Sequence, residues 1–439
     1  MNSILTPLNA GYPIHAVLDH LSSVGLLDRR AAPDLERVRA LSFGQLVDAG
    51  VFIARAGGGN TVRVESAFSH CASVGLSGGP YPCVSSDCRL DRARDLGRYA
   101  IMLSDRVYTY NPFSQFVPAP SGSIEIEDSV DVRLDFWTGL RILCEWAPLI
   151  EEGLVFPFPH TDHYCHWCLA KRSFGPDAGR RLDEGISTFV RRFHSEARVT
   201  LRQDDHGLQL EVRAPGDLIE HGRSFLSVEK VPRSMRSPRV LRCLSDGDPV
   251  EVSRRVVQGL KIATSYSDNL LHAVRYGLVA NQLLRTSYVT DGQAEIDLLT
   301  TLSDRRDIVE RNRISAKHLS NVIPFLRQLP IGPLLKLRIH EGDAFLRYRA
   351  ALSEAAATVL SAQSGTPSER DARAVFKDVV APELARIGIL VRGARRRSLS
   401  GGARAVAGWG IALGVGIYSG LVPAELLEAS KALGATALV

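Results

Sequence analysis

The stretch that decides the fold is DRARDLGRYAIMLSDRVYTYNPF, residues 91–113. Residues 91–103 have the apolar spacing that is typical of a helix, and residues 106–113 alternate as a strand does. Only a short break separates them, so the helix leads directly into the strand. This order predicts that helices and strands are mixed along the chain, as in an α+β protein.

The same mixture extends to both sides of this stretch. Helical periodicity predicts two N-terminal helices, over 15–27 and 33–50, and the alternating run 61–68 predicts a strand. Further along, the patterns predict an amphipathic helix over 129–146, a short strand over 153–159 that proline ends, a helix over 177–194 and a hairpin over 197–214.

From Pro249 onward the periodicity is helical over many turns, so we expect a mainly helical C-terminal half. A Cys-rich, mixed N-terminal half precedes it, and a Gly-rich basic tail follows it. The expected segments are an N-terminal mixed region with a Cys-bearing loop (1–120), an α+β region with a CxxC motif and the hairpin (121–248), a helical domain (249–385) and a basic, apolar, Gly-rich tail (386–439).

The composition is that of a globular protein. Among 439 residues 45% are hydrophobic and 23% are charged, which excludes global disorder and a polytopic membrane protein and allows two or three cores. The net charge is +5, and Arg far outnumbers Lys in every segment. GC-rich coding explains this bias more simply than phosphate recognition does. The charge alone therefore does not indicate a nucleic-acid partner, and nucleic acid is kept as an open alternative.

Cysteine clusters in two short patches that also carry histidine, residues 69–88 and 160–168. Cys165 and Cys168 form a CxxC, and Cys83 and Cys88 form a CxxxxC. At these spacings two thiolates can bind one tetrahedral zinc ion. We therefore predict a structural zinc held by these four residues, provided that the two patches meet in space. The spare candidate ligands are Cys71 and His163.

Reduced thiols without a ligand are the first alternative for Cys165 and Cys168, and a redox dithiol is the second. An aromatic residue and the CxxC follow an expected strand, where a helix N-terminus would lower the pKa of the first thiol. Two features oppose the redox hypothesis: Pro157 and Pro159 disfavour a central strand, and we expect no regular βαβ pattern around the motif.

The C-terminal tail raises a separate question. Six Arg precede AVAGWGIALGVGIYSGLVPA, residues 405–424, which has no charge and would be about 30 Å long as a helix. Its apolar side chains are few, so insertion into a bilayer would be marginal. A Gly-rich helix buried against the helical domain is favoured, and membrane contact through 405–424 is the alternative.

These observations leave several functions open. Residues 1–21 lack the features of a secretory signal, so we expect a bacterial cytosolic protein whose cysteines are thiols or metal ligands. The leading hypothesis is a non-enzymatic regulatory or interaction module, stapled by zinc, with an unknown protein partner. The alternatives are a membrane-associated effector acting through its tail, and a metal- or thiol-dependent enzyme acting on nucleic acid or a small substrate. No nucleotide-binding or HExxH motif occurs, and no catalytic residue is assigned.

Overall fold

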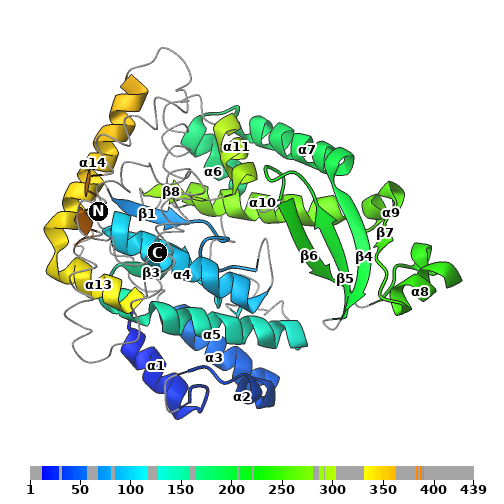
Figure 1. The fold of residues 1–439 in the computed structure, drawn as a ribbon, viewed down its shortest axis with the longest axis horizontal. Helices are drawn as coiled ribbons and strands as arrows, with labels where there is room; N and C mark the ends of the chain where they lie inside the picture. Colours follow the sequence, from blue (N-terminus) through cyan, green and yellow to red (C-terminus); the bar gives the residue numbers. More distant parts are fainter. Residues whose placement is uncertain are drawn as a thin grey trace, which may run out of the picture. The chain divides into compact units, whose positions relative to one another are not determined.

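The structure is a computed structural model of the 439-residue chain. It describes residues 12–28, 32–56, 68–80, 85–116, 127–158, 165–204, 207–219, 222–228, 230–279, 286–290, 292–302, 331–361, 382–383, 386–387 and 389. The expected α+β class is confirmed, because the described residues form many helices and two separate sheets (Figure 1).

The first sheet is parallel throughout, in the order β3-β2-β1-β8. Its strands are β1 (Ser69–Ala72), β2 (Arg106–Tyr110), β3 (Val155–Phe158) and β8 (Ser287–Val289). Helix α4 (Ser86–Leu103) connects β1 to β2, and α5 (Val130–Glu151) connects β2 to β3. This regular βαβ arrangement corrects the expectation that none surrounds the CxxC motif. The strands are only three to five residues long, which is too short for their alternation to stand out in the sequence.

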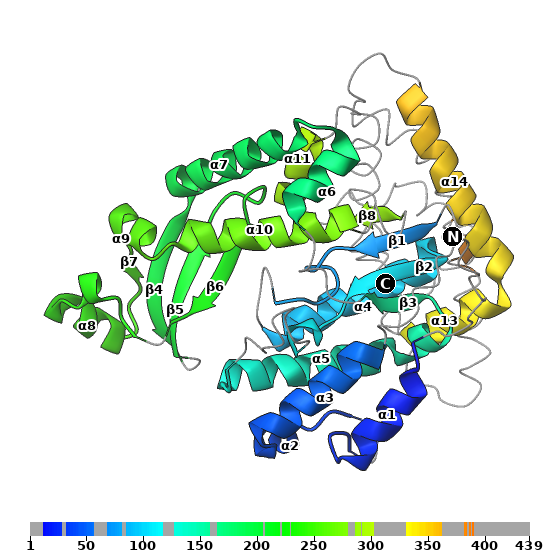
Figure 2. The ribbon, with the colours of Figure 1, turned by 180° about the vertical axis from the view of Figure 1, so that it is seen from behind.

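Helices α4 and α5 lie on one face of the parallel sheet, as right-handed crossovers in the same direction require (Figures 1 and 2). The buried Trp146 of α5 donates its indole N–H to the carbonyl of Ala93 in α4 at 2.9 Å. The outer side of α5 carries α1 (Ile14–Ser23), α2 (Leu35–Ala40) and α3 (Phe43–Ala56). Arg133 of α5 holds α2 by donating to the carbonyl of Leu41 at 2.8 Å.

The other face of the parallel sheet is covered by α10 (Ile262–Val279) (Figure 2). Tyr276 of α10 meets Tyr110 of β2 and Phe158 of β3 edge to face, with ring centroids 6.4 and 6.1 Å apart. Both contacts are at the last residue of a strand. The carboxyl ends of β2 and β3 therefore lie beneath α10, against which α6 (His166–Phe174) and α7 (Ala178–Glu196) also pack.

The second sheet is antiparallel, in the order β6-β5-β4-β7. Its strands are β4 (Arg198–Asp204), β5 (Gly207–Arg213), β6 (Arg223–Ser227) and β7 (Val250–Glu251), so the expected hairpin is confirmed. Alternation gives the sheet one apolar face, built from the buried Val199, Leu201, Leu210 and Val212. On the opposite face Glu211 is covered by arginine side chains.

Two strands, β7 and β8, lie in the region from Pro249 that we expected to be helical. That expectation is wrong at these places because each short segment pairs with an existing strand, β7 with β4 and β8 with β1. Pairing with a preformed edge outweighs the local preference of two or three residues. Elsewhere in this region the described residues form helices as expected, including α9 (Arg254–Gly259), α10 and α11 (Gln293–Leu302).

The chain divides into two compact units, one of residues 1–96 and 106–309 and the other of residues 97–105 and 310–439. The second unit contains the last turns of α4 with α13 (Ile331–His340) and α14 (Gly342–Ser361). Arg338 of α13 donates to the carbonyl of Ala100 at 2.8 Å, and Arg349 of α14 pairs with Asp105. Arg338 thus satisfies carbonyls in the last turn of α4, and Arg349 contacts the carboxylate just beyond it.

A turn after β1 depends on Gly78, which has φ +73°. A Cβ there would lie 2.7 Å from the Ile142 side chain and 2.8 Å from the carbonyl oxygen of Arg89. Gly78→Ala should therefore lower the free energy of unfolding by about 2–3 kcal/mol. Chemical denaturation would measure this change. Gly44→Ala is the matched control, since nothing lies within 4 Å of a Cβ there, and it should stabilise α3 by about 0.5–1 kcal/mol.

Candidate functional site: a dithiol at the start of α6

The CxxC motif lies where the chain enters α6. Strand β3 ends at Phe158, residues 159–164 lie outside the described residues, and Cys165 is the residue that caps the N-terminus of α6. Cys165 has extended backbone geometry (φ −69°, ψ 117°), and Cys168 falls in the first helical turn. Gly175, with φ +94°, ends the helix after Lys171 and Arg172 of its last turn. The motif thus follows the edge strand of a parallel sheet and opens a helix.

Both sulfur atoms are accessible, because Cys165 and Cys168 are exposed and free of any disulfide. The backbone N–H of Cys168 lowers the pKa of Cys165, and so do the Cys168 thiol, the N–H of Trp167 and the ammonium of Lys171. The Cys165 side chain does not form a full capping hydrogen bond. The pKa of Cys168 is raised, because its thiol donates to Cys165 and faces the negative charge that forms there. The two thiols are therefore different in acidity.

Trp167 lies between the two cysteines and is anchored to the next helix. Its indole N–H donates to Oδ1 of Asp183 in α7 at 2.7 Å, yet 44% of the residue stays exposed. The His166 ring packs on Trp167 with centroids 3.9 Å apart. Burial lowers the pKa of His166, and the nearby Arg275 of α10 lowers it further. An exposed aromatic surface thus borders the thiols, and the lowered pKa of His166 favours the neutral form of the adjacent imidazole.

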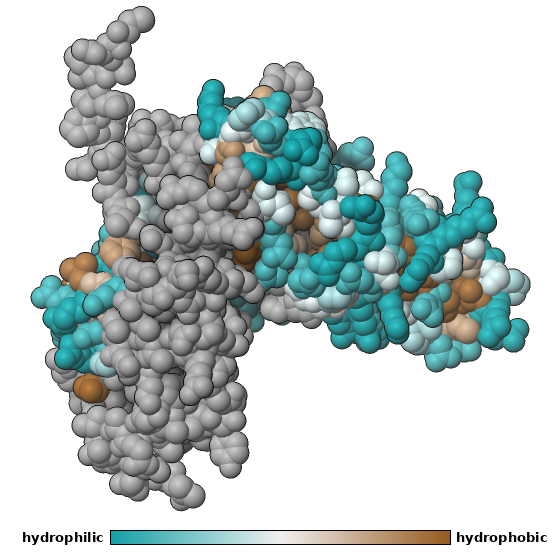
Figure 3. Space-filling view, turned by 90° about the horizontal axis from the view of Figure 1, so that it is seen from above, coloured by the Kyte–Doolittle hydropathy of each residue, from teal (hydrophilic) through white to brown (hydrophobic). Residues whose placement is uncertain are grey.

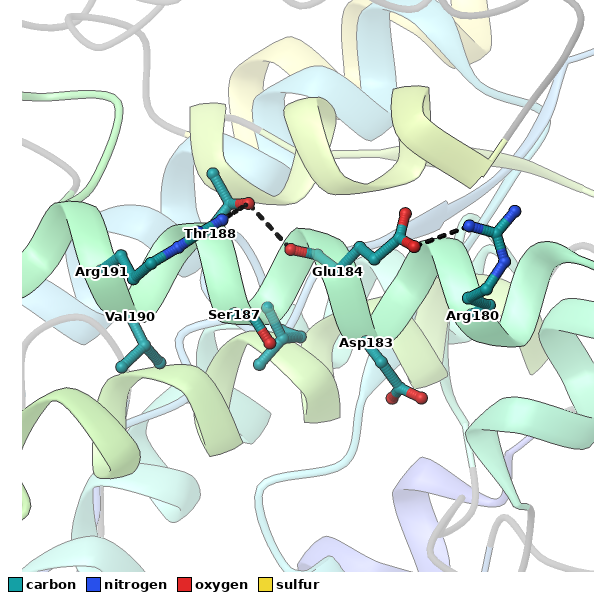
Figure 4. Close-up of a pocket in the computed structure, with 8 residues that line it drawn as sticks. Arg180, Asp183, Glu184, Ser187, Thr188, Val190 and Arg191 are labelled. Carbon is teal, nitrogen blue, oxygen red and sulfur yellow. Dashed lines mark hydrogen bonds and ion pairs between the residues drawn. The ribbon is translucent and has the colours of Figure 1, made fainter.

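A pocket lies along α7, next to the hydrogen bond between Trp167 and Asp183 (Figure 4). Its described lining comes from one helix, namely Arg180, Asp183, Glu184, Ile186, Ser187, Thr188, Val190 and Arg191. In Figure 4 Arg180 and Glu184 point to one side of the helix, where they pair at 2.7 Å, and Asp183 points to the other. Asp183 is shared with Trp167, so the pocket borders the dithiol. Its described lining carries charged, hydroxyl and apolar side chains and includes no thiol and no histidine.

The predicted zinc ligands are only partly brought together. Cys165 and Cys168 are adjacent, whereas Cys88 lies in the first turn of α4 and Cys71 is buried in β1, where burial raises its pKa. Cys83 and His163 lie outside the described residues. Within the described ranges no three or more His, Cys, Asp or Glu side chains form a group able to hold a metal ion. The structural zinc therefore stays a prediction.

The two interpretations of the tail, a buried Gly-rich helix and membrane contact, are also untested. Residues 405–424 lie outside the described residues. None of the helices that the structure describes combines the length and the apolar character that crossing a bilayer needs.

No protein-family model, curated protein or solved structure matches the chain. The proposed function therefore rests on the residues of the site itself.

Sequence reasoning missed the partners of the CxxC. Asp183 is a helix surface residue with no distinctive spacing, and only the packing of α6 on α7 brings it to Trp167. Arg275 likewise reaches His166 because α10 packs on α6. No signal in a single sequence identifies these contacts, since they join segments up to about a hundred residues apart.

Proposed function

We propose that Cys165 and Cys168 form a redox-active dithiol that exchanges disulfides with a partner molecule. The observation that carries this proposal is the position of Cys165 at the N-terminus of α6, with a second thiol in the same turn. A helix N-terminus favours negative charge, and the thiolate is the form of cysteine that attacks a disulfide.

The surroundings support Cys165 as the attacking residue and Cys168 as the resolving residue. Cys165 is the thiol whose pKa is lowered, by the N–H of Cys168 first and by Lys171 last. Residues three apart at the start of a helix have Cβ atoms about 5–6 Å apart, so a modest adjustment suffices for a bond between their sulfurs. The exposed face of Trp167 offers an apolar contact for the incoming disulfide.

The exchange takes place in two steps. The Cys165 thiolate attacks a disulfide R–S–S–R′, forms the bond Cys165–S–S–R and releases R′–S⁻. Cys168 then gives its proton to the released thiolate, attacks Sγ of Cys165 and releases R–S⁻. Two electrons pass from the protein to the partner, so the Cys165–Cys168 pair becomes a disulfide and the partner becomes two thiols. A small thiol or dithiol reductant then restores the pair by the reverse exchange.

Trapping the intermediate tests this function. A Cys168→Ser variant, mixed with glutathione disulfide, should accumulate one covalent glutathione on Cys165, because the resolving thiol is missing. A Cys165→Ser variant should gain none on Cys168 within the same time. Intact mass and peptide mapping identify the adduct. Equal modification of Cys165 and Cys168 in their respective variants would contradict the division of roles, and no modification of either would contradict the proposal.

A zinc-stapled regulatory or interaction module is the second proposal, because the exposed and free thiols of Cys165 and Cys168 are equally accessible to a metal ion. It requires Cys83 and Cys88 as the other ligands. Metal analysis of the native protein beside a Cys83→Ser/Cys168→Ser variant separates the two proposals. About one zinc per chain, lost in the variant, is the result expected for the staple.

A further inference from the structure

Residues 230–242 carry a basic side chain at every third position, an arrangement that we call the basic row. Its members are Lys230, Arg233, Arg236, Arg239 and Arg242, and all five are exposed. The segment 230–245 contains no acidic residue. Most of it forms the short helix η3 (Arg233–Met235) and the helix α8 (Pro238–Ser245), beside the β7 edge of the antiparallel sheet (Figures 1 and 2).

The segment is held in a defined conformation by the side chains that it buries. Met235 and Leu244 are both buried, and α8 begins with Ser237, whose hydroxyl accepts from the N–H of Val240 at 3.3 Å. Arg239 and Arg242 are one turn apart, on the side of α8 opposite Leu244. The basic row is thus displayed on a rigid support instead of a free loop.

These cations lack the ion pairs that many other arginines of the described chain form. On α7, Arg180 pairs with Glu184 at 2.7 Å and Arg192 with Glu196 at 2.9 Å. Within the described residues, no member of the basic row forms an ion pair, and only Arg236 donates a side-chain hydrogen bond, to the carbonyl of Val231 at 2.8 Å. Asp246, after α8, donates its backbone N–H to the carbonyl of Arg242 at 2.9 Å, but among the described residues neither its carboxylate nor that of Asp248 forms an ion pair with the row. A solvated helix face usually balances its charges, and this face does not.

We propose that the basic row binds the phosphate backbone of duplex nucleic acid without regard to sequence. The chain from Arg233 to Arg242 can extend at most about 20 Å, the length of about six base pairs. Four of its five members are Arg, whose planar guanidinium binds phosphate oxygens with two hydrogen bonds. This proposal goes beyond the dithiol chemistry and does not depend on it.

Two other ligands, single-stranded nucleic acid and a membrane surface, fit the basic row less well. Single-stranded nucleic acid is bound by stacking its bases on aromatic rings, and residues 230–245 contain no Phe, Tyr or Trp. A membrane-surface helix needs a broad apolar face, whereas the exposed large apolar side chain of α8 is Leu241 alone. The end of the unit that carries α8, at the right in Figures 1 and 3, is mainly hydrophilic with a small hydrophobic patch.

Salt-dependent binding of the full chain tests the proposal. We expect two unrelated 20-base-pair duplexes to bind equally, with Kd of about 10⁻⁴–10⁻⁶ M near physiological salt. The plot of log K against log salt concentration should have a slope of about −3 to −4, from three to five phosphate contacts. Arg239→Ser/Arg242→Ser should weaken binding about tenfold and reduce the slope by about 2. Fluorescence anisotropy between 50 and 200 mM salt measures both quantities.

A matched variant and two other ligands make the test decisive. Arg39→Ser/Arg55→Ser removes the same charge from exposed positions on α2 and α3 and should leave the slope unchanged. An unchanged slope in Arg239→Ser/Arg242→Ser, or equal losses in both double variants, would overturn the proposal. Vesicles with anionic lipid and inorganic polyphosphate are the competing ligands, and preference for either over duplex at the same salt would also overturn it.

Discussion

Replacing Trp146 with alanine should lower the free energy of unfolding by about 3–5 kcal/mol. Only 1% of this residue is exposed, and it is the largest of the fully buried side chains. Its removal opens a cavity between α4 and α5 and leaves the carbonyl of Ala93 without the indole donor 2.9 Å away. The two helices connect β1, β2 and β3, so we expect the loss of packing between them to destabilise the whole parallel sheet. Chemical denaturation followed by far-UV circular dichroism measures it.

Two variants separate the causes of this loss. Trp146→Phe keeps most of the volume and removes the hydrogen bond, so we expect a loss of about 1–2 kcal/mol. Trp167→Ala removes a tryptophan that is 44% exposed and should cost less than about 1 kcal/mol. If Trp146→Ala cost no more than Trp167→Ala, the packing of α5 on α4 described above would be wrong.

Glu211→Ala should lower the free energy of unfolding by about 2–3 kcal/mol. The side chain of Glu211 is 4% exposed and accepts from Arg223 at 2.7 Å and from Arg202 at 3.2 Å, with Arg213 also in contact. Without the carboxylate, Arg213 and Arg223 face each other directly across β5 and β6 as like charges. The three guanidinium groups are 36–64% exposed, and solvent screening keeps the loss below that of a fully buried pair.

The stability that the Glu211 carboxylate contributes should decrease as the pH falls. Burial alone would raise the pKa of Glu211, but the hydrogen bonds and charges of Arg213 and Arg223 outweigh it and hold the pKa below its usual value. The stability that the ionised carboxylate contributes is complete above the unfolded pKa, at about 4.3, and is lost as the pH falls through the lower folded pKa. Denaturation of the wild type and Glu211→Gln from pH 7 to pH 3 should show that the difference between their free energies of unfolding becomes smaller in acid. A difference that becomes larger below about pH 4 would contradict the contacts between Glu211 and its arginines.

Glu184→Ala is the control for this effect, since Glu184 is 61% exposed in its pair with Arg180. It should change the free energy of unfolding by less than about 0.5 kcal/mol.

Local patterns predicted the elements whose signal lies within one segment. The helix and strand of residues 91–113 appear as α4 and β2, and the hairpin 197–214 appears as β4 and β5. The βαβ order was missed because strands of three to five residues carry no visible alternation, and because Pro157 and Pro159 disfavour a central strand. Pro157 lies in β3, an edge strand of the described sheet, where a missing N–H is tolerated.

The candidate site was predicted only in part. The spacing of Cys165 and Cys168 indicated a pair of thiols, and that pair lies where a helix begins. Spacing cannot choose between metal and redox chemistry, because the choice depends on groups that tertiary packing supplies. Trp167 and Asp183 meet through the packing of α6 on α7, and Glu211 gains its three arginines through strand register. The period-three row from Lys230 to Arg242 was visible in the sequence, but its lack of carboxylate partners was not.

Redox titration of the purified full chain distinguishes a redox-active Cys165–Cys168 pair from a zinc site. The protein is equilibrated in glutathione buffers of about −270 to −120 mV, and intact mass, peptide mapping and metal content are measured on the same samples. The dithiol account predicts that the Cys165–Cys168 pair opens and closes reversibly, with a loss of two hydrogen atoms on closing, and that the reduced protein holds no zinc. A pair that stays reduced throughout, with one zinc bound per chain, would contradict the account and support the zinc staple.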